Sequence, residues 1–168
     1  MSEEEKKRYR NRKIVTVIVM GILVLIFGLI GLLQLNSLKR TPTSERTEAI
    51  NSNIPTIVMF YSKTCPDCKR VIGTVKLARF KSYGNPTRQD YGVAFVEVNT
   101  PDDKDLVNQY HITKTPTFMI FKNGQPQAIG SANGFDVFQY AGTDKEQIKS
   151  LYTNLVLKQG GDSQWLMR

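Results

Sequence analysis

The sequence predicts an α/β domain with a mixed central sheet and flanking helices, preceded by one transmembrane helix. The chain has 168 residues, enough for one ordinary domain and one accessory segment. Runs of β-branched and aromatic residues alternate with helical patterns over residues 53–158, and their order β-α-β-α-β-β-α implies a mixed sheet covered by helices. Residues 14–33 are almost wholly apolar, which predicts the membrane helix.

The apolar segment is long enough to cross a bilayer. No charged side chain occurs from Ile14 to Leu38, and twenty residues at 1.5 Å rise span about 30 Å, the thickness of a hydrocarbon core. The alternative is a cleaved signal peptide, which has a shorter apolar core followed by small residues at the cleavage site. Residues 34–39 contain no such site. We therefore predict an uncleaved anchor over residues 14–35.

The basic residues around the anchor predict its orientation. Cytoplasmic flanks carry an excess of Lys and Arg. Six basic residues precede the helix and three follow it closely: Lys6, Lys7, Arg8, Arg10, Arg12 and Lys13 before, and Lys39, Arg40 and Arg46 after. Residues 1–13 are thus predicted to be a cytoplasmic tail of a single-pass cell-membrane protein, with the domain outside the cytoplasm.

The formal net charge of +8 does not indicate a nucleic-acid partner. The 23 Lys and Arg residues are scattered, and no basic run with interleaved aromatic residues occurs beyond the anchor flank. A solvated basic surface facing an anionic envelope explains the charge.

The first half of the domain begins after a polar segment. Residues 36–52 are expected to form a stalk, with a short helix at 44–50. Residues 56–61 form a continuous apolar run, as expected of a strand covered on both faces. Pro66 then opens a helix that continues to about Phe80, because its missing N–H costs nothing at the first helical position.

The second half contains two more strands, a hairpin and two helices. Strands are predicted at 93–98 and 117–121, a helix begins at 101, and Asn123-Gly124 indicates a hairpin. Thr143 or Asp144 caps the last helix, which runs to about Lys158, and residues 159–168 form a C-terminal tail.

The only two cysteines of the chain, Cys65 and Cys68, lie where the first domain helix begins. Cys65 occupies the N-cap, where free N–H groups and the helix dipole lower the pKa of a thiol below about 8.5. The neighbouring cations act in the same direction and Asp67 opposes them; the cations are Lys63, Lys69 and Arg70. Cys65 is the candidate nucleophile, and Cys68 is the candidate resolving thiol.

Two other roles for the pair are less consistent with the sequence. A permanent Cys65–Cys68 disulfide closes so small a loop that it contributes little to stability. A zinc site needs four ligands, but there is no second cysteine pair and His111 is the only histidine. We predict a redox-active dithiol with no metal and no cofactor.

An ordered set of motifs over residues 53–158 resembles the thioredoxin-like superfamily. The set comprises 57–61 running into Cys65-Pro66-Asp67-Cys68, then 110–117, then 121–124, and Gly142 before the last helix. The resemblance implies a thioredoxin-like fold and a cis peptide bond before Pro116, packed beside the dithiol. It also implies that the backbone of Thr115 pairs with an extended substrate strand.

The sequence departs from thioredoxins around the dithiol. Thr64 replaces the usual Trp before the first cysteine, and Pro66-Asp67 replaces Gly-Pro. Met59 and Phe95 align with a buried aspartate and its neighbouring lysine. The usual proton acceptor for Cys68 is therefore missing, and water or a client group must serve, so resolution is expected to be slow near neutral pH.

Two segments resemble insertions into the shared frame, 81–91 and 131–140. The second contains Phe135, Phe138 and Tyr140, for which buried packing is expected over an aromatic client-binding rim.

These observations predict a membrane-tethered, extracytoplasmic thiol–disulfide oxidoreductase that forms, reduces or isomerises disulfides in exported proteins or peptides. A membrane redox partner is expected. The residues do not decide the direction of electron flow. Disulfides persist outside the cytoplasm, which makes a donor of oxidising equivalents natural. The close alternative is a reductase, which would need electrons passed through the membrane by another protein. The non-enzymatic alternative is a scaffold or adaptor of an envelope secretion or transfer apparatus.

Overall fold

The structure is a computed structural model that describes residues 3–35, 39–83, 91–132 and 134–158. The chain divides into two compact units, residues 1–37 and residues 38–168. Each unit is described by itself.

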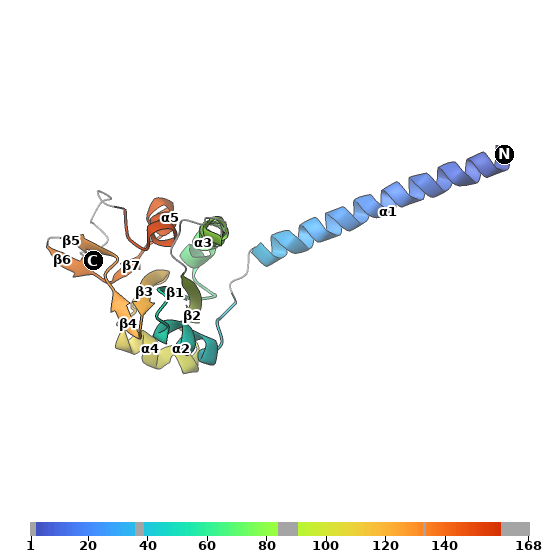
Figure 1. Ribbon diagram of the computed structural model, residues 1–168. Helices are drawn as coiled ribbons and strands as arrows, with labels where there is room; N and C mark the ends of the chain where they lie inside the picture. Colours follow the sequence, from blue (N-terminus) through green and yellow to red (C-terminus); the bar gives the residue numbers. More distant parts are fainter. Residues whose placement is uncertain (1–2, 36–38, 84–90, 133, 159–168) are drawn as a thin grey trace. The chain divides into compact units, whose positions relative to one another are not determined.

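The first unit is the helix α1, Glu3–Leu35. It contains one stretch, Lys13–Ile30, that is long and apolar enough to cross a membrane, a property it shares with signal sequences. The helix begins well before the apolar run, so the predicted basic tail and the predicted anchor lie on one continuous helix (Figure 1).

The second unit is built on a five-stranded mixed sheet, as predicted. Its strands are β1 Thr56–Tyr61, β2 Gly92–Glu97, β3 Thr117–Lys122, β4 Gln125–Gln127 and β7 Gln139–Ala141. The order is β2-β1-β3-β4, and β7 also pairs with β3. Among the strand pairings of the described residues in this sheet, only β1–β2 is parallel. The carboxyl end of β1 leads directly into the dithiol.

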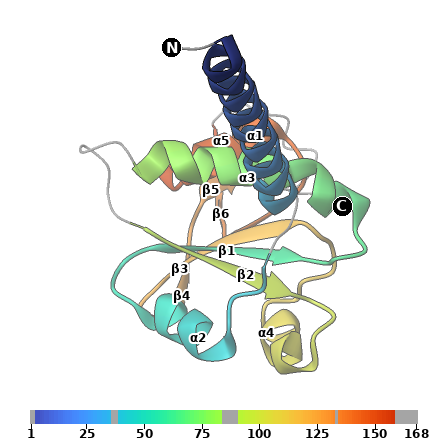
Figure 2. The same cartoon turned by 90° about the vertical axis from the view of Figure 1, so that its right-hand side faces the viewer.

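Helices cover both faces of this sheet. The helices α3 (Pro66–Tyr83) and α5 (Lys145–Asn154) lie on one face, and α2 (Thr43–Asn51) and α4 (Lys104–Gln109) lie on the other (Figures 1 and 2). A short 3-10 helix, η1 (Pro101–Asp103), precedes α4.

Strand β1 contributes to both cores, because successive side chains of a strand point to opposite faces. Ile57, Met59 and Tyr61 belong to the apolar cluster that includes α3 and α5 residues, and Val58 and Phe60 belong to the other cluster. All six β1 residues are buried, as the continuous apolar run predicted.

The predicted stalk is the main correction to the sequence-based architecture. Thr41 exchanges backbone and side-chain hydrogen bonds with Phe95 of β2, at 3.0 and 2.9 Å. Arg40 and Arg46 both form ion pairs with the fully buried carboxylate of Asp103. Residues 40–51 are therefore part of the folded unit, because long-range partners hold a segment that looks like a polar linker.

Most predicted turns and caps are confirmed. Asn123 and Gly124 both have positive φ, 52° and 74°, as a two-residue primed hairpin turn requires. Asp144 caps α5 by accepting hydrogen bonds from the N–H groups of Glu146 and Gln147, at 2.7 and 3.0 Å.

Helix ends differ from the prediction in two places. Helix α3 continues to Tyr83, beyond the predicted start of the loop, while residues 84–90 lie outside the described residues. Helix α5 ends at Asn154, because Leu155 adopts a left-handed conformation with φ 56°. The N–H of Leu157 then donates to the carbonyl of Ile129 at 2.6 Å, so a tertiary hydrogen bond redirects the chain. The predicted tail at 159–168 lies outside the described residues.

The second predicted insertion contains most of a separate hairpin, formed by β5 (Gly130–Ala132) and β6 (Phe135–Val137). Of its three aromatic residues only Tyr140 is buried, whereas Phe135 is 78% exposed and Phe138 is 42% exposed. Buried packing was expected for this group, and it holds for one of the three.

Candidate active site

Cys65 lies at the N-cap of α3, between β1 and the first helical turn. Its N–H donates to the carbonyl of Ser62 at 3.2 Å, and its carbonyl accepts from the N–H of Lys69 at 3.3 Å. The helix begins at Pro66. This is the predicted position, which directs free N–H groups of the first turn toward the sulfur.

Hydrogen bonds to the Cys65 sulfur outweigh its burial. The N–H of Cys68 donates to Sγ of Cys65 at 3.2 Å, which stabilises the thiolate. The protonated Cys65 thiol in turn donates to the carbonyl of Thr115 at 3.3 Å. Burial alone would raise the pKa of the Cys65 thiol. Hydrogen bonds from the Cys68 and Thr115 side chains, and from the Cys68 and Asp67 backbone, lower that pKa below its usual value.

Cys68 has the opposite character. It is only 1% exposed, against a half-buried Cys65. Burial, followed by the interaction with Cys65, raises the pKa of the Cys68 thiol to about 11. At neutral pH, the accessible sulfur is the one that ionises more readily.

Two cations expected to stabilise the Cys65 thiolate have carboxylate partners instead. Lys63 pairs with Glu97 at 2.7 Å, and Arg70 pairs with Asp67 at 3.1 Å. Both cations are largely exposed, so water screens their charge further. The lowered pKa of Cys65 therefore rests mainly on direct hydrogen bonds.

The Thr115–Pro116 peptide bond is cis, as the resemblance implied. Its position beside the dithiol is established by the contact between the Thr115 carbonyl and the Cys65 sulfur. The carbonyl of Pro116 accepts from the N–H of Gly142 at 3.2 Å, which connects this loop to the segment before α5.

The residues between the cysteines and before them are accessible. Thr64 and Pro66 are exposed and Asp67 is half-buried. The Thr64 hydroxyl lies 2.9 Å from that of Ser62, so this hydroxyl is held within a local turn.

Met59 and Phe95 lie side by side in the β1–β2 register, as the alignment predicted. Both belong to, or pack against, the apolar cluster that contains Cys68. On this face of the sheet, apolar side chains therefore occupy the two positions at which the sequence lacks the charged pair of thioredoxins.

The sequence analysis did not identify the next pair on the same face of the sheet, Tyr61 and Glu97. Glu97 is buried and lies directly opposite Tyr61 in the β1–β2 register. Its signal in the sequence is a single acid two residues after Phe95 in an otherwise apolar strand, which places it on the Phe95 face.

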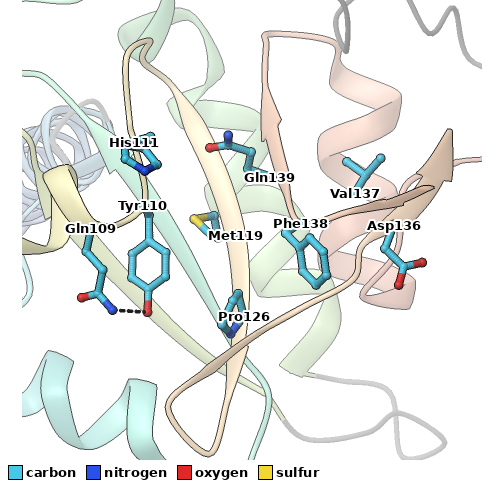
Figure 3. A pocket seen from close by; sticks show the side chains of 9 residues that line it. All are labelled: Gln109, Tyr110, His111, Met119, Pro126, Asp136, Val137, Phe138 and Gln139. Carbon is cyan, nitrogen blue, oxygen red and sulfur yellow. Dashed lines mark hydrogen bonds between the residues drawn. The ribbon is translucent and has the colours of Figure 1, made fainter.

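A separate cavity of about 440 Å³ lies between the end of α4 and the segment that contains β6 and β7 (Figure 3). It is lined by Gln109, Tyr110, His111, Met119, Pro126, Asp136, Val137, Phe138 and Gln139. Neither cysteine lines it, and neither residue of the cis peptide does. The dithiol and this cavity are distinct features.

Comparison with known sequences identifies the family. The thioredoxin family model matches residues 38–149. Thioredoxin 1 from Synechococcus elongatus is 33% identical over 87 residues, which cover 51% of this chain and 73% of the relative. Thioredoxin from Porphyra purpurea is 32% identical over 85 residues, with coverage of 51% and 73%.

Solved structures agree on the fold. Oxidised thioredoxin from Plasmodium falciparum superposes with a TM-score of 0.50 at 23% identity, covering 69% of this chain and 95% of that one. Thioredoxin from Trypanosoma brucei brucei has a TM-score of 0.50 at 14% identity, covering 68% and 87%. This chain therefore belongs to the thioredoxin family and is a thiol–disulfide oxidoreductase with a thioredoxin-like α/β fold.

Proposed function

We propose that this protein is a membrane-tethered, extracytoplasmic thiol–disulfide oxidoreductase that forms, reduces or isomerises disulfides in exported proteins or peptides. In this proposal Cys65 exchanges with the client and Cys68 resolves the mixed disulfide. The observation that carries it is the asymmetry of the two thiols: Cys65 is accessible with a lowered pKa, and Cys68 is buried with a pKa raised to about 11.

The exchange follows from this asymmetry. During reduction the Cys65 thiolate attacks one sulfur of a client disulfide, and the other client sulfur leaves as a thiolate. The Cys68 sulfur then attacks Cys65, which releases the second client sulfur and leaves a Cys65–Cys68 disulfide. Oxidation of a client dithiol is the same sequence in reverse.

The client strand is proposed to lie along the cis-proline loop. The Thr115 carbonyl already accepts a hydrogen bond from the Cys65 thiol, so a strand paired with the Thr115 backbone would meet the reactive sulfur. Thr64, Pro66 and Asp67 flank this approach and would contact the client first.

The membrane location rests on α1. Its apolar stretch is long enough to span a bilayer, and basic residues are more numerous before it than after it. Tethering restricts the enzyme to clients and redox partners at the membrane surface.

Trapping of mixed disulfides tests the assignment of the two cysteines. Cys68→Ala should accumulate disulfide-linked client complexes that disappear on reduction, because no thiol remains to resolve them. Cys65→Ala should accumulate none and serves as the matched control. A reversed pattern would contradict the roles. Full activity of Cys65→Ser in the cell would instead support a scaffold that retains only the fold.

The equilibrium potential of the Cys65–Cys68 couple assigns the direction of transfer. A value near that of thioredoxin, about −270 mV, makes the protein a reductant, and a value near about −120 mV makes it an oxidant.

A further inference from the structure

A chain of three polar side chains lies beside the dithiol, on the loop between β1 and α3 and the end of β2. The Asn99 amide donates from Nδ2 to the Ser62 hydroxyl at 2.9 Å, and the Ser62 and Thr64 hydroxyls lie 2.9 Å apart. The N–H of Thr64 also donates to the Ser62 hydroxyl, at 3.3 Å. The chain of hydrogen bonds ends at Thr64, the exposed residue directly before Cys65.

Strand pairing places Asn99 beside this loop. The N–H of Val98 donates to the carbonyl of Tyr61 at 3.0 Å, which continues the parallel β1–β2 pairing beyond both strands. The N–H of Thr100 donates to the carbonyl of Glu97 at 3.0 Å and closes a turn. Backbone hydrogen bonds therefore hold the chain on both sides of Asn99, and they fix where its amide lies.

The hydrogen-bonding capacity of Ser62 sets the direction of the chain. A hydroxyl oxygen accepts two hydrogen bonds and donates one. The Asn99 amide and the Thr64 N–H fill both acceptor positions of Ser62, so Ser62 donates its own proton to the Thr64 hydroxyl. Ser62 is only 8% exposed, which leaves little access for other partners. Among the described residues the Thr64 hydroxyl has no other partner, so its own proton is available to a bound molecule.

The surroundings of Cys65 match the two polar groups of a peptide unit. The Thr115 carbonyl, 3.3 Å from the Cys65 sulfur, is an acceptor on the cis-proline loop. The Thr64 hydroxyl is a donor one residue away from the same sulfur. An extended peptide carries an N–H donor and a carbonyl acceptor on each residue. A client strand whose N–H meets Thr115 therefore needs a donor for a neighbouring carbonyl.

Building on the proposed function, we propose that the Thr64 hydroxyl, directed by Asn99 and Ser62, donates a hydrogen bond to a peptide carbonyl of the client beside its reacting cysteine. Thr64 transfers no proton. The Cys65 thiolate bonds to one client sulfur, the client S–S bond breaks, and the other client sulfur leaves with the electron pair. Thr64 is a client-binding residue that favours peptide disulfides over disulfides without a carbonyl. Asn99 and Ser62 are positioning residues.

Two small disulfides separate recognition of a peptide carbonyl from the exchange chemistry. The disulfide dimer of N-acetylcysteine N-methylamide has peptide groups on both sides of each cysteine, whereas 2-hydroxyethyl disulfide has no carbonyl. The reduced full chain in detergent micelles is mixed with an excess of each and quenched with acid. Mass spectrometry of the remaining reduced protein then times the attack by Cys65. Each rate is divided by the thiolate fraction, taken from the alkylation midpoint of Cys65 in the same variant, so a changed pKa does not contribute.

Thr64→Val removes the hydroxyl at nearly constant size. It should slow attack on the peptide disulfide about threefold to tenfold, the effect of losing one hydrogen bond, and leave attack on 2-hydroxyethyl disulfide unchanged. Thr64→Ser keeps the hydroxyl and should retain the wild-type rates with both disulfides.

Asn99→Asp tests the direction of the chain. A carboxylate only accepts, so Ser62 would donate to the new carboxylate and Thr64 would donate to Ser62, which takes the Thr64 proton away from the client. This variant should show the same selective loss as Thr64→Val. The double variant should show no further loss, because both substitutions remove the same hydrogen bond.

Thr153→Val is the matched control, because Thr153 is an exposed threonine of α5, and it should change neither rate. A wild-type rate with the peptide disulfide in Thr64→Val would overturn the proposal, and if that variant does not fold, the same result in Asn99→Asp would do so. Equal slowing with both disulfides would also overturn it, and a selective loss in Thr64→Val alone would overturn the role of Asn99. Absence of reaction between the wild-type protein and both disulfides would instead refute the proposed exchange by Cys65.

Discussion

The backbone N–H of Cys68 donates a hydrogen bond to the Sγ of Cys65 at 3.2 Å. The buried cysteine therefore stabilises the thiolate of the accessible one, while its own thiol is held protonated by burial. One turn of helix makes two chemically identical side chains unequal, because only the first sulfur faces the free N–H groups of the helix start.

Alkylation of the reduced protein should separate the two thiols by pH. Cys65 should react with iodoacetamide with a midpoint below the usual pKa of 9.0, and Cys68 should stay protected until pH approaches about 11. The sign follows from the thiolate being the nucleophile, so a lowered pKa shifts reaction to lower pH and a raised pKa shifts it higher. Peptide mass spectrometry at each pH measures both. Equal midpoints would contradict the assigned asymmetry.

Thr115→Val should raise the pKa of Cys65, because it removes a side-chain hydrogen bond that favours the thiolate and keeps the size of the residue. The alkylation midpoint of Cys65 should move upward and its exchange at neutral pH should slow. Thr113→Val, an exposed change in the same loop, is the control. An unchanged midpoint in Thr115→Val would show that the backbone hydrogen bonds suffice.

Met59→Asp should destabilise the fold and speed resolution. Met59 is fully buried beside Phe95, so a charged carboxylate there lacks a partner and should cost about 3 kcal/mol of the free energy of unfolding. As a proton acceptor near Cys68, it should also speed resolution of the mixed disulfide near neutral pH. Met59→Leu should do neither. Unchanged stability and kinetics in Met59→Asp would mean that Met59 does not lie near the dithiol.

Arg46→Met should lower the free energy of unfolding by about 3 kcal/mol, because it leaves the buried Asp103 with fewer cationic partners. Arg70→Met breaks an exposed pair with Asp67 and should cost less than about 1 kcal/mol. Denaturant unfolding of both variants measures the difference. Equal effects would argue against the docking of residues 40–51 on the domain through Arg46 and Asp103.

The membrane orientation is tested by a reporter fused after Arg168. Alkaline phosphatase, which is active only outside the cytoplasm, should be active in the fusion, because the basic residues before α1 outnumber those after it. The mass of the mature protein should include residues 1–35, which distinguishes an anchor from a cleaved signal. A reporter active only in the cytoplasm would overturn the orientation.

Much of the fold and of the dithiol could be predicted from the sequence, because those features depend on local chemistry. An apolar run of strand length, Pro66 at a helix start, Asn123-Gly124 at a turn and Asp144 at a cap each act through neighbours in the chain. The position of Cys65 at the N-cap and the pairing of Met59 with Phe95 follow from the same local patterns and the family resemblance.

Tertiary structure decided the features whose partners are distant in the chain. Asp103 converts a polar segment around Arg40 and Arg46 from a predicted stalk into part of the domain. The carbonyl of Ile129 accepts from Leu157, just beyond the early end of α5. In the sequence Glu97 is an ordinary charged residue. Only the parallel β1–β2 register shows that it lies opposite Tyr61. In each case burial and hydrogen bonding depend on strand pairing and helix docking, which bring together residues that no local pattern connects.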